Sequence, residues 1–269
     1  MGNTKNYTLG SGHLHIQAFT NSTLPDNWDT FFNSTSNILG RIKGGASFEY
    51  STEKTEDEDD LGYIKICEVT KENVVLTSGM MTWDADTLAK LCQTARSTTG
   101  ADGMVTTKIG GLGNQTDTVW VLGFEHRSKG LRVIIVGKNN EGFTFDFKQD
   151  AATVIDCKFK AEASDSDGTL IIIQDLRKAP VAESVTIGSL ALSPAFNKYV
   201  KTYTAATTSA TDNITVVAPT GITATIKNGE TPVTSGAAAT WTTGENVVTV
   251  DCEDANNKKF TYTITVTKS

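Results

Sequence analysis

The chain has 269 residues and a formal net charge of −7, with 20% charged and 38% hydrophobic residues. This balance is typical of a folded protein rather than a disordered one, and the length suffices for two domains. There is no run of about 18 apolar residues, which argues against a transmembrane helix. The acidic balance argues against a high-affinity nucleic-acid binder, because such a protein needs a basic face. It is compatible with a surface past which DNA slides without sticking.

The N-terminal region is predicted to contain a strand followed by a loop. His13–Phe19 alternates polar and apolar residues, which places His13 and His15 on one strand face. Two histidines at this spacing could ligate a metal, but no third ligand is near, so a half-exposed strand face is preferred. The aromatic-rich stretch Asn21–Ile38 is predicted to be a loop that docks on its own sheet or on a neighbouring molecule.

The stretch Gly40–Leu91 organises the first half of the chain. A strand at Ala46–Thr52 leads into the acidic run Glu53–Asp60, and strand patterns follow at Gly62–Thr70 and Asn73–Leu76. We interpret this stretch as a long, charged, extended arm of the kind by which a subunit contacts its neighbours. The candidate interaction residues are its acids: Glu49, Glu53, Glu56, Asp57, Glu58, Asp59 and Asp60.

One amphipathic helix is predicted after Gly79. Asp84 is a suitable N-cap, because its carboxylate can accept hydrogen bonds from the exposed amides of the first turn. An apolar stripe recurs at helical spacing, and the helix is expected to end between Ser97 and Gly100, where small polar residues cluster. The stripe consists of Leu88, Leu91, Cys92 and Ala95.

The remaining half of the chain reads as strands. Gly100–Gly113 is a Gly/Thr-rich passage in which Gly110–Asn114 is predicted to be a flexible turn. Residues 1–178 are predicted to form a mostly antiparallel sheet domain. After a linker at 179–183, residues 184–269 are rich in Thr, Ala and Val and carry short, closely spaced strands, the signature of a small β-sandwich. The predicted strands are Thr116–His126, Leu131–Gly137, Gly142–Phe147, Ala152–Ala163, Leu170–Asp175, Val185–Leu192, Tyr199–Ala205, Ile214–Ala218, Ile222–Lys227, Asn246–Cys252 and Phe260–Thr267.

No motif predicts chemistry. The clustered acids form a solvated run that lacks the spaced ligands and glycine of a calcium loop, and catalytic carboxylates are usually few and desolvated. No nucleophile elbow is present. The cysteines have no C-x-x-C spacing, and the first ten residues lack an apolar signal core, so reduced, buried thiols are expected. We therefore predict no catalytic residue, no metal site, no cofactor and no enzyme. The cysteines are Cys67, Cys92, Cys157 and Cys252.

Two stretches resemble known families. Between Leu39 and Leu91, the elements GRIKGGASFEYSTE, DDLG, Gly79-x-x-Thr82-Trp83 and DTLAKL look like the major tail tube protein of long, non-contractile-tailed bacteriophages, and the resemblance covers most of residues 1–178. Between Ser184 and Ser269, LALSPAF and GENVVTVDCEDANNKKFTYTITVTK are similar to the cadherin-like, immunoglobulin-like domain of bacterial and phage proteins. That family usually has an Asp-Gly turn before the last strand, where this chain has Asp254-Ala-Asn-Asn.

The resemblance implies a mainly β fold. It would be a tail-tube β-sandwich or barrel with one flanking helix outside it and a long extended arm, followed by a small immunoglobulin-like β-sandwich. It also implies a structural virion protein, assembled in the host bacterial cytoplasm, that stacks as hexameric rings into the phage tail tube. The acidic lumen would pass DNA during ejection, and the acidic arm would contact the next ring or line that lumen.

The implied partners are further copies of the chain, the tail tip or initiator, the tape measure and tail terminator proteins, and viral DNA passing without specific binding. The sandwich would decorate the outside of the tube, with weak contact to host-surface glycans. Two alternatives stay open. One is the tube of a contractile injection device or tailocin, and the other is a surface adhesin built from β modules.

Overall fold

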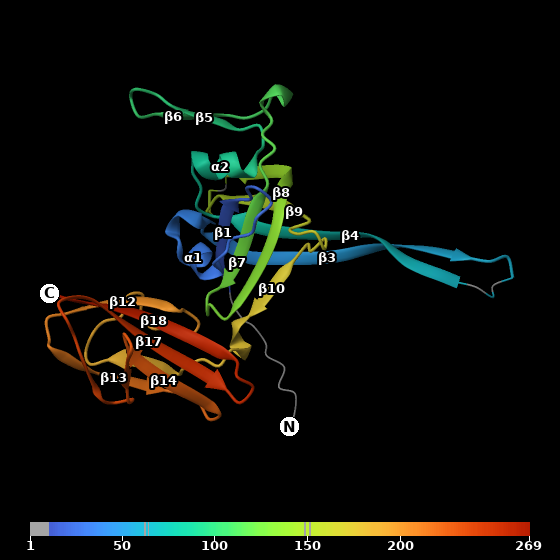
Figure 1. The fold of residues 1–269 in the computed structure, drawn as a ribbon. Coiled ribbons are helices and arrows are strands. Elements are labelled where there is room, and N and C mark those ends of the chain that lie inside the picture. The colour runs from blue at the N-terminus through green and yellow to red at the C-terminus, as the bar shows by residue number, and fades with distance from the viewer. Residues whose placement is uncertain (1–10, 62, 64, 148, 151) are drawn as a thin grey trace. The chain divides into compact units, whose positions relative to one another are not determined.

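A computed structural model describes residues 11–61, 63, 65–147, 149–150 and 152–269 (Figure 1). The expected mainly β fold is confirmed. The chain divides into two compact units, of which unit 1 runs to Arg127 and resumes over Arg132–Gln174. Unit 2 comprises Ser128–Leu131 and Asp175–Ser269. The boundary thus lies slightly before the predicted one at residue 178. The absence of a signal core concerns the first ten residues, which lie outside the described part.

Unit 1 is built on one curled sheet. Its strand order is β2-β1-β7-β8-β9-β4-β3, and β10 also pairs with β8. The outermost strands β2 and β3 are separated along the chain only by Arg41, so the two edges must approach each other and the sheet must curl round. The strands are β1 (Gly12–Ala18), β2 (Ile38–Gly40), β3 (Ile42–Glu58), β4 (Lys65–Met80), β7 (Trp120–His126), β8 (Leu131–Asp146), β9 (Val154–Glu162) and β10 (Ile172–Asp175).

The curl encloses an apolar core. Strand β9 shows how the sequence specifies it, because alternate residues are buried and exposed as predicted, with period two. Burying such side chains contributes about 1.5–3 kcal/mol each. The core residues are Leu14, Ile16, Leu39, Val74, Leu76, Met80, Leu88, Leu91, Leu122, Ile135, Ile155, Cys157, Phe159 and Ala161.

Helix α2 (Ala85–Leu91) begins as predicted and ends earlier. The Asp84 carboxylate accepts hydrogen bonds from the Thr87 amide at 2.8 Å and the Thr87 hydroxyl at 3.0 Å, and these bonds lower the pKa of Asp84. The helix ends at Leu91 rather than near residue 97 because the chain turns there into strand β5 (Arg96–Thr99). Leu88 and Leu91 pack into the apolar core of unit 1, whereas Asp86 on the other side of the helix is exposed.

A second helix was not predicted. Helix α1 (Trp28–Asn33) lies in the stretch expected to be a loop, and the Asn27 side chain accepts hydrogen bonds from the amides at its start. Phe31 and Phe32 pack on the outer face of β7 and β8, over Gly123, where an added Cβ would lie within 2.7 Å of both rings. The aromatic residues therefore dock on their own chain. Six residues are too few for helical periodicity to be detected in a sequence.

A buried ion-pair network ties α1 to the sheet. The Arg132 guanidinium donates to Glu125 at 3.0 Å and to Asp29 of α1 at 2.8 Å, and the Arg132 and Glu125 side chains are each only 3% exposed. Arg132 also lies 4.7 Å from the ring centroid of Phe32. Such a network is stable only while each charge keeps its partners. It therefore couples the position of α1 to the register of β7 and β8.

The two histidines of β1 share a face, as predicted, with ring centroids 6.5 Å apart. His15 is not half-exposed, however. It is buried, with its ring 5.2 Å from that of Phe32, because α1 covers this face of the strand.

Unit 2 is a β-sandwich of a three-stranded and a five-stranded sheet around one core. The last strand alternates between buried and half-buried residues, in line with the predicted period of two. The strands are β11 (Ser184–Ile187), β13 (Thr211–Val217) and β16 (Ala238–Thr240) in one sheet, and β12 (Thr202–Thr207), β18 (Lys259–Lys268), β17 (Gly244–Asp254), β14 (Ile222–Asn228) and β15 (Thr231–Val233) in the other.

The motif residues of unit 2 have structural roles. Phe196 stacks on Tyr203, with ring centroids 5.6 Å apart, and the Tyr203 hydroxyl donates to the Asn197 carbonyl at 2.6 Å. Before β18, Asn257 adopts a positive φ of 59° and the Asp254 carboxylate accepts from two backbone amides. Asparagine tolerates the left-handed region, so this turn forms without an Asp-Gly pair.

We expect Arg132→Met to lower the free energy of unfolding of unit 1 by about 3–5 kcal/mol, because it removes the cation that Glu125 and Asp29 face. Urea unfolding measures the change. Lys160→Met, on the exposed face of β9, is the matched control and should change stability little. Equal stabilities of the two variants would contradict a structural role for the network.

We expect Tyr262→Phe to destabilise unit 2 by about 1–3 kcal/mol, the cost of a buried polar group that loses its partner. The Tyr262 hydroxyl accepts from the Ala182 amide at 3.0 Å and donates to the Lys198 carbonyl at 2.8 Å. Unfolding of unit 2 can be followed through Trp241, its one tryptophan. The control Tyr63→Phe, at an 83% exposed position, should be neutral. Indistinguishable unfolding curves for the two variants would refute this role of Tyr262.

Candidate self-assembly surface

The predicted arm is a two-stranded ribbon. Strands β3 and β4 pair from Ile42↔Met80 to Glu58↔Lys65, whereas β9 accompanies β4 only over Val75–Met80. Beyond that point, among the described residues, the two strands pair only with each other and project from the sheet (Figure 1). At roughly 3.4 Å per residue, Ser51–Glu58 reaches about 27 Å. Glu53–Glu58 of the acidic run thus forms the outer part of a paired strand, and Asp59 and Asp60 follow it.

Two irregularities shape the ribbon. At its base, Gly44 and Gly45 are extra residues of β3 with φ of 84° and 86°, a conformation that favours glycine. Farther out, Thr70 is an extra residue of β4 opposite the Glu53–Lys54 step. Such bulges bend a strand and increase its twist. The ribbon's direction is therefore fixed by the bulges as well as by the sheet.

The ribbon carries most of the net charge of the chain. Residues 49–72 contain nine acids and three lysines, a net charge of −6 out of −7 for the whole protein. Two of the lysines pair with acids across the strands, Lys65 with Glu56 at 2.9 Å and Lys71 with Glu53 at 2.6 Å. Pairs this exposed contribute little stability, so the ribbon remains a source of negative potential.

The structure places the outer acids on both faces of β3 and at the end of the ribbon. Because successive side chains of β3 alternate, Glu53 and Asp57 lie on one face and Glu56 and Glu58 on the other. The remaining two of the outer acids, Asp59 and Asp60, follow β3 at the end of the ribbon.

Glu49 lies apart from the other acids. It pairs with Val75 in the part of the ribbon that β9 supports, and its charge contributes to raising the pKa of Lys158, after the larger effect of Glu141. Its grouping with the six outer acids is therefore not supported.

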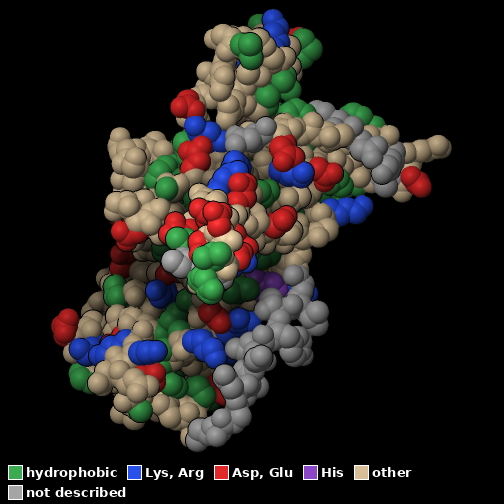
Figure 2. All heavy atoms as spheres, turned by 90° about the vertical axis from the view of Figure 1, so that its right-hand side faces the viewer, with side chains coloured by type: hydrophobic (Ala, Val, Ile, Leu, Met, Phe, Trp, Pro, Cys, Tyr) green, Lys and Arg blue, Asp and Glu red, His purple; other side chains and the backbone are tan. Residues whose placement is uncertain are grey.

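Large apolar side chains are exposed on the same ribbon. They lie 52–83% exposed among the acids, and Figure 2 shows hydrophobic and acidic side chains together where the ribbon points toward the viewer. In an isolated monomer, an exposed strand with this composition promotes aggregation. In an assembly, the same strand can form the contact between subunits. The residues are Tyr50, Leu61, Tyr63, Ile66 and Val69.

A second exposed hairpin was missed by the sequence analysis. Strands β5 and β6 (Val105–Lys108) pair only with each other among the described residues. Strand β5 lies where the helix was expected to end, and β6 lies in the Gly/Thr-rich passage for which no strand was predicted. Arg96 donates to the Gly110 carbonyl at 2.8 Å and holds the base of the hairpin. Threonines of high strand propensity at Thr98, Thr99, Thr106 and Thr107 are the signal that could have revealed it.

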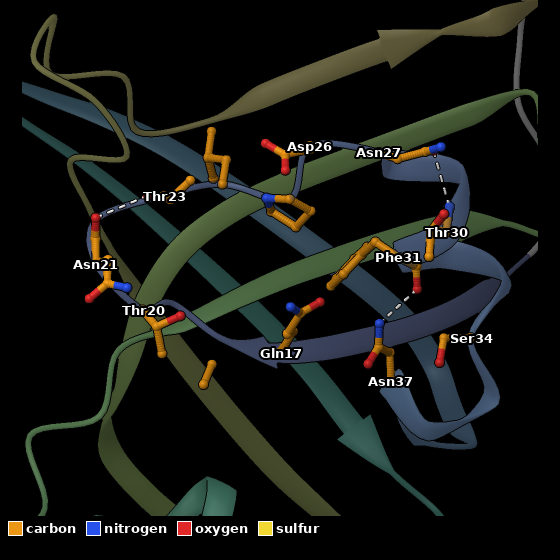
Figure 3. Close-up of a pocket in the computed structure, with 13 residues that line it drawn as sticks. Gln17, Thr20, Asn21, Thr23, Asp26, Asn27, Thr30, Phe31, Ser34 and Asn37 are labelled. Carbon is orange, nitrogen blue, oxygen red and sulfur yellow. Dashed lines mark hydrogen bonds between the residues drawn. The ribbon is translucent and has the colours of Figure 1, made fainter.

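A hollow beside α1 is lined by Gln17, Thr20, Asn21, Asp26, Asn27, Thr30 and neighbouring residues (Figure 3). Part of its polar lining maintains the local fold. Asn27 caps α1, the Asn37 amide donates to the Phe31 carbonyl at 3.0 Å, and the Thr23 hydroxyl donates to the Asn21 carbonyl at 3.0 Å. This lining has one carboxylate and no histidine, cysteine, lysine or arginine. It does not supply an acid–base pair.

Within the described residues, no group of three or more His, Cys, Asp or Glu side chains is arranged to hold a metal ion. In the same part of the chain, no helix has the length and apolar composition required to cross a membrane. The ribbon and the hairpin, by contrast, are exposed surfaces suited to contact with another molecule.

All four cysteines are free thiols, and Cys157 and Cys252 are buried as expected. The expectation is wrong for Cys67, which lies exposed on the ribbon, and Cys92 is only half-buried. We expect Cys67 to react first with a thiol reagent at pH 8. Burial raises the pKa of Cys157 to about 12 and that of Cys252 to about 11, so their thiolate fractions are small. Cys67→Ser should remove the fast phase. Rapid labelling of Cys157 and Cys252 in the native protein would contradict this structure.

No model of a known protein family matches the chain, and no curated protein is significantly similar to it. The function must therefore be inferred from the geometry of the ribbon and from the residue patterns that resemble tail tube proteins.

Proposed function

We propose that this protein is a structural subunit that assembles with copies of itself into the tail tube of a long-tailed bacteriophage. The observation that carries the proposal is the β3–β4 ribbon, which projects from a curled sheet with exposed apolar side chains and a net charge of −6. The resemblance of Leu39–Leu91 to tail tube proteins supports the same function.

The exposed strand edges favour assembly over a monomer. Strand β3 ends the sheet order, so no strand of the described residues covers its outer edge over Ile42–Glu58. Natural monomers usually shorten or cover such an edge, because its backbone groups pair readily with another strand. In a ring of subunits the edge is used instead, since each copy can complete the sheet of the next.

The charge of the ribbon fits a conduit. DNA phosphates are repelled by carboxylates, so a tube with acidic ribbons on its inner wall lets DNA pass without binding it. The same acids would weaken assembly through mutual repulsion, which the exposed apolar residues and backbone pairing must outweigh. In the proposed virion, the tail tip, tape measure and terminator proteins are the further partners.

Unit 2 is proposed to decorate the outside of the tube. It has its own core, and a channel that passes DNA has no space for a second globular unit in each copy. Weak contact with glycans of the host surface is the role that the resemblance suggests for it.

The test is to replace Lys54–Thr70 with Asn-Gly. Glu53 and Lys71 are cross-strand partners, so a two-residue turn can close the shortened hairpin. The wild-type protein should form rings or tubes visible by negative-stain electron microscopy at high concentration, whereas the shortened variant should stay monomeric because it lacks the contact surface.

Circular dichroism and thermal unfolding serve as the folding controls for this variant, and both should match the wild type. Ile66→Asp combined with Val69→Asp is the smaller change and should reduce assembly in the same direction. Normal tubes from the shortened variant would refute a role of the ribbon in assembly.

A further inference from the structure

The edge of β1 is open where β2 ends. The pairing of β1 with β2 covers Leu14↔Gly40 and His15↔Ile38, whereas β7 accompanies β1 as far as Ala18. On the β2 side, no strand of the described residues therefore pairs with the last residues of β1. The 3-10 turn Thr35–Asn37, which leads into β2, lies close to β1, but it is not a paired strand. An edge without a strand partner can accept a further strand through main-chain hydrogen bonds.

The hollow beside α1 lies at this same edge. Gln17 and Ala18 of β1 form part of its wall, and Figure 3 shows Gln17 between Thr20 and Asn37. The lining contains four amide side chains, four hydroxyl side chains and a single charged group, Asp26. Amides and hydroxyls can both donate and accept hydrogen bonds, as an extended polar chain requires. The lone carboxylate favours an occupant that carries a positive charge.

The β5–β6 hairpin has the extended backbone, polar side chains and positive charge that the hollow favours in an occupant. Arg96–Thr99 and Val105–Lys108 are short strands of mainly serine and threonine, almost entirely exposed and paired only with each other among the described residues. The hairpin carries Arg96 and Lys108 against a single acid, Asp102. Because the Arg96 guanidinium already donates to the Gly110 carbonyl, Lys108 is the cation that remains available to a partner.

The hairpin of the same copy does not reach the hollow. In Figure 1 the β5–β6 hairpin lies beyond α2, whereas α1 lies on the opposite side of that helix, beside β1 and β7. A contact between the two surfaces therefore joins different copies. Because one copy offers the hairpin and the other the hollow, the contact is heterologous, and repetition of it produces a ring or a filament.

We propose that the β5–β6 hairpin of one copy adds β6 to the free edge of β1 in a second copy, with Lys108 facing Asp26. This inference rests on the proposed function, since it names a surface by which the copies assemble. It is separate from the ribbon contact. The exposed residues Met104 and Val105 of the hairpin would then pack against the apolar part of the hollow formed by Leu24 and Pro25.

The test is a charge swap between Asp26 and Lys108 in the full-length protein. Asp26→Lys and Lys108→Asp should each raise the concentration needed for half-assembly by about tenfold or more, because like charges then face each other at the contact. The double variant should restore assembly to near the wild-type concentration. Sedimentation velocity measures the assembled fraction. Asp167→Lys and Lys258→Asp make the same charge changes at other exposed positions and are the matched controls.

The outcomes separate this inference from the proposed function. If the wild type assembles and both single variants assemble equally well, the hairpin contact is refuted while self-assembly stands. Impaired single variants without restoration in the double variant would refute the pairing of Lys108 with Asp26. If the wild type stays monomeric at the highest attainable concentration, the proposed function fails, and this inference fails with it. Circular dichroism confirms the folding of each variant, and both substituted positions are exposed.

Discussion

The curl of the eight-stranded sheet is the constraint on which the rest of unit 1 depends. A single residue, Arg41, connects the two edge strands, so the sheet encloses its apolar core while the chain continues directly into β3. Strand β9 is too short to accompany β3 and β4 to their ends. The outer part of the pair must therefore leave the body of the sheet, and its side chains are exposed on both faces.

The distribution of charge follows from this geometry. A segment that lacks a core on either face can carry a high density of acids, because its carboxylates stay hydrated. The body of unit 1 shows the opposite case: Arg132, Glu125 and Asp29 are in contact under α1, where desolvation requires that each charge have a partner. Negative charge therefore accumulates on the surface that we assign to self-assembly, while the buried charges hold the scaffold from which that surface projects.

The protein thus has two different surfaces for contact between copies, the ribbon and the β5–β6 hairpin. The ribbon combines apolar side chains with acids, and the β5–β6 hairpin combines threonines with a lysine. An assembly that uses both can join neighbours in two directions, as stacked rings require. The edge strands of unit 2 are shorter than β3, and Pro232, which has no amide hydrogen to donate, lies in the edge strand β15.

The sequence by itself determined the mainly β class, the alternation of β9 and β18, the N-cap at Asp84 and the sandwich of unit 2. Each depends on a local signal, either a period of two or the hydrogen-bonding capacity of a single side chain. Only the tertiary structure decided that the acidic run is a strand, because its pattern of exposure reflects the absence of a third strand rather than any local preference. It also decided that α1 forms over Gly123, that α2 contributes Leu88 and Leu91 to the core of unit 1, and that Glu49 lies nearer to the body of the sheet than the other acids. These features depend on which strands become neighbours, and strand pairing between residues far apart in the chain leaves no local pattern.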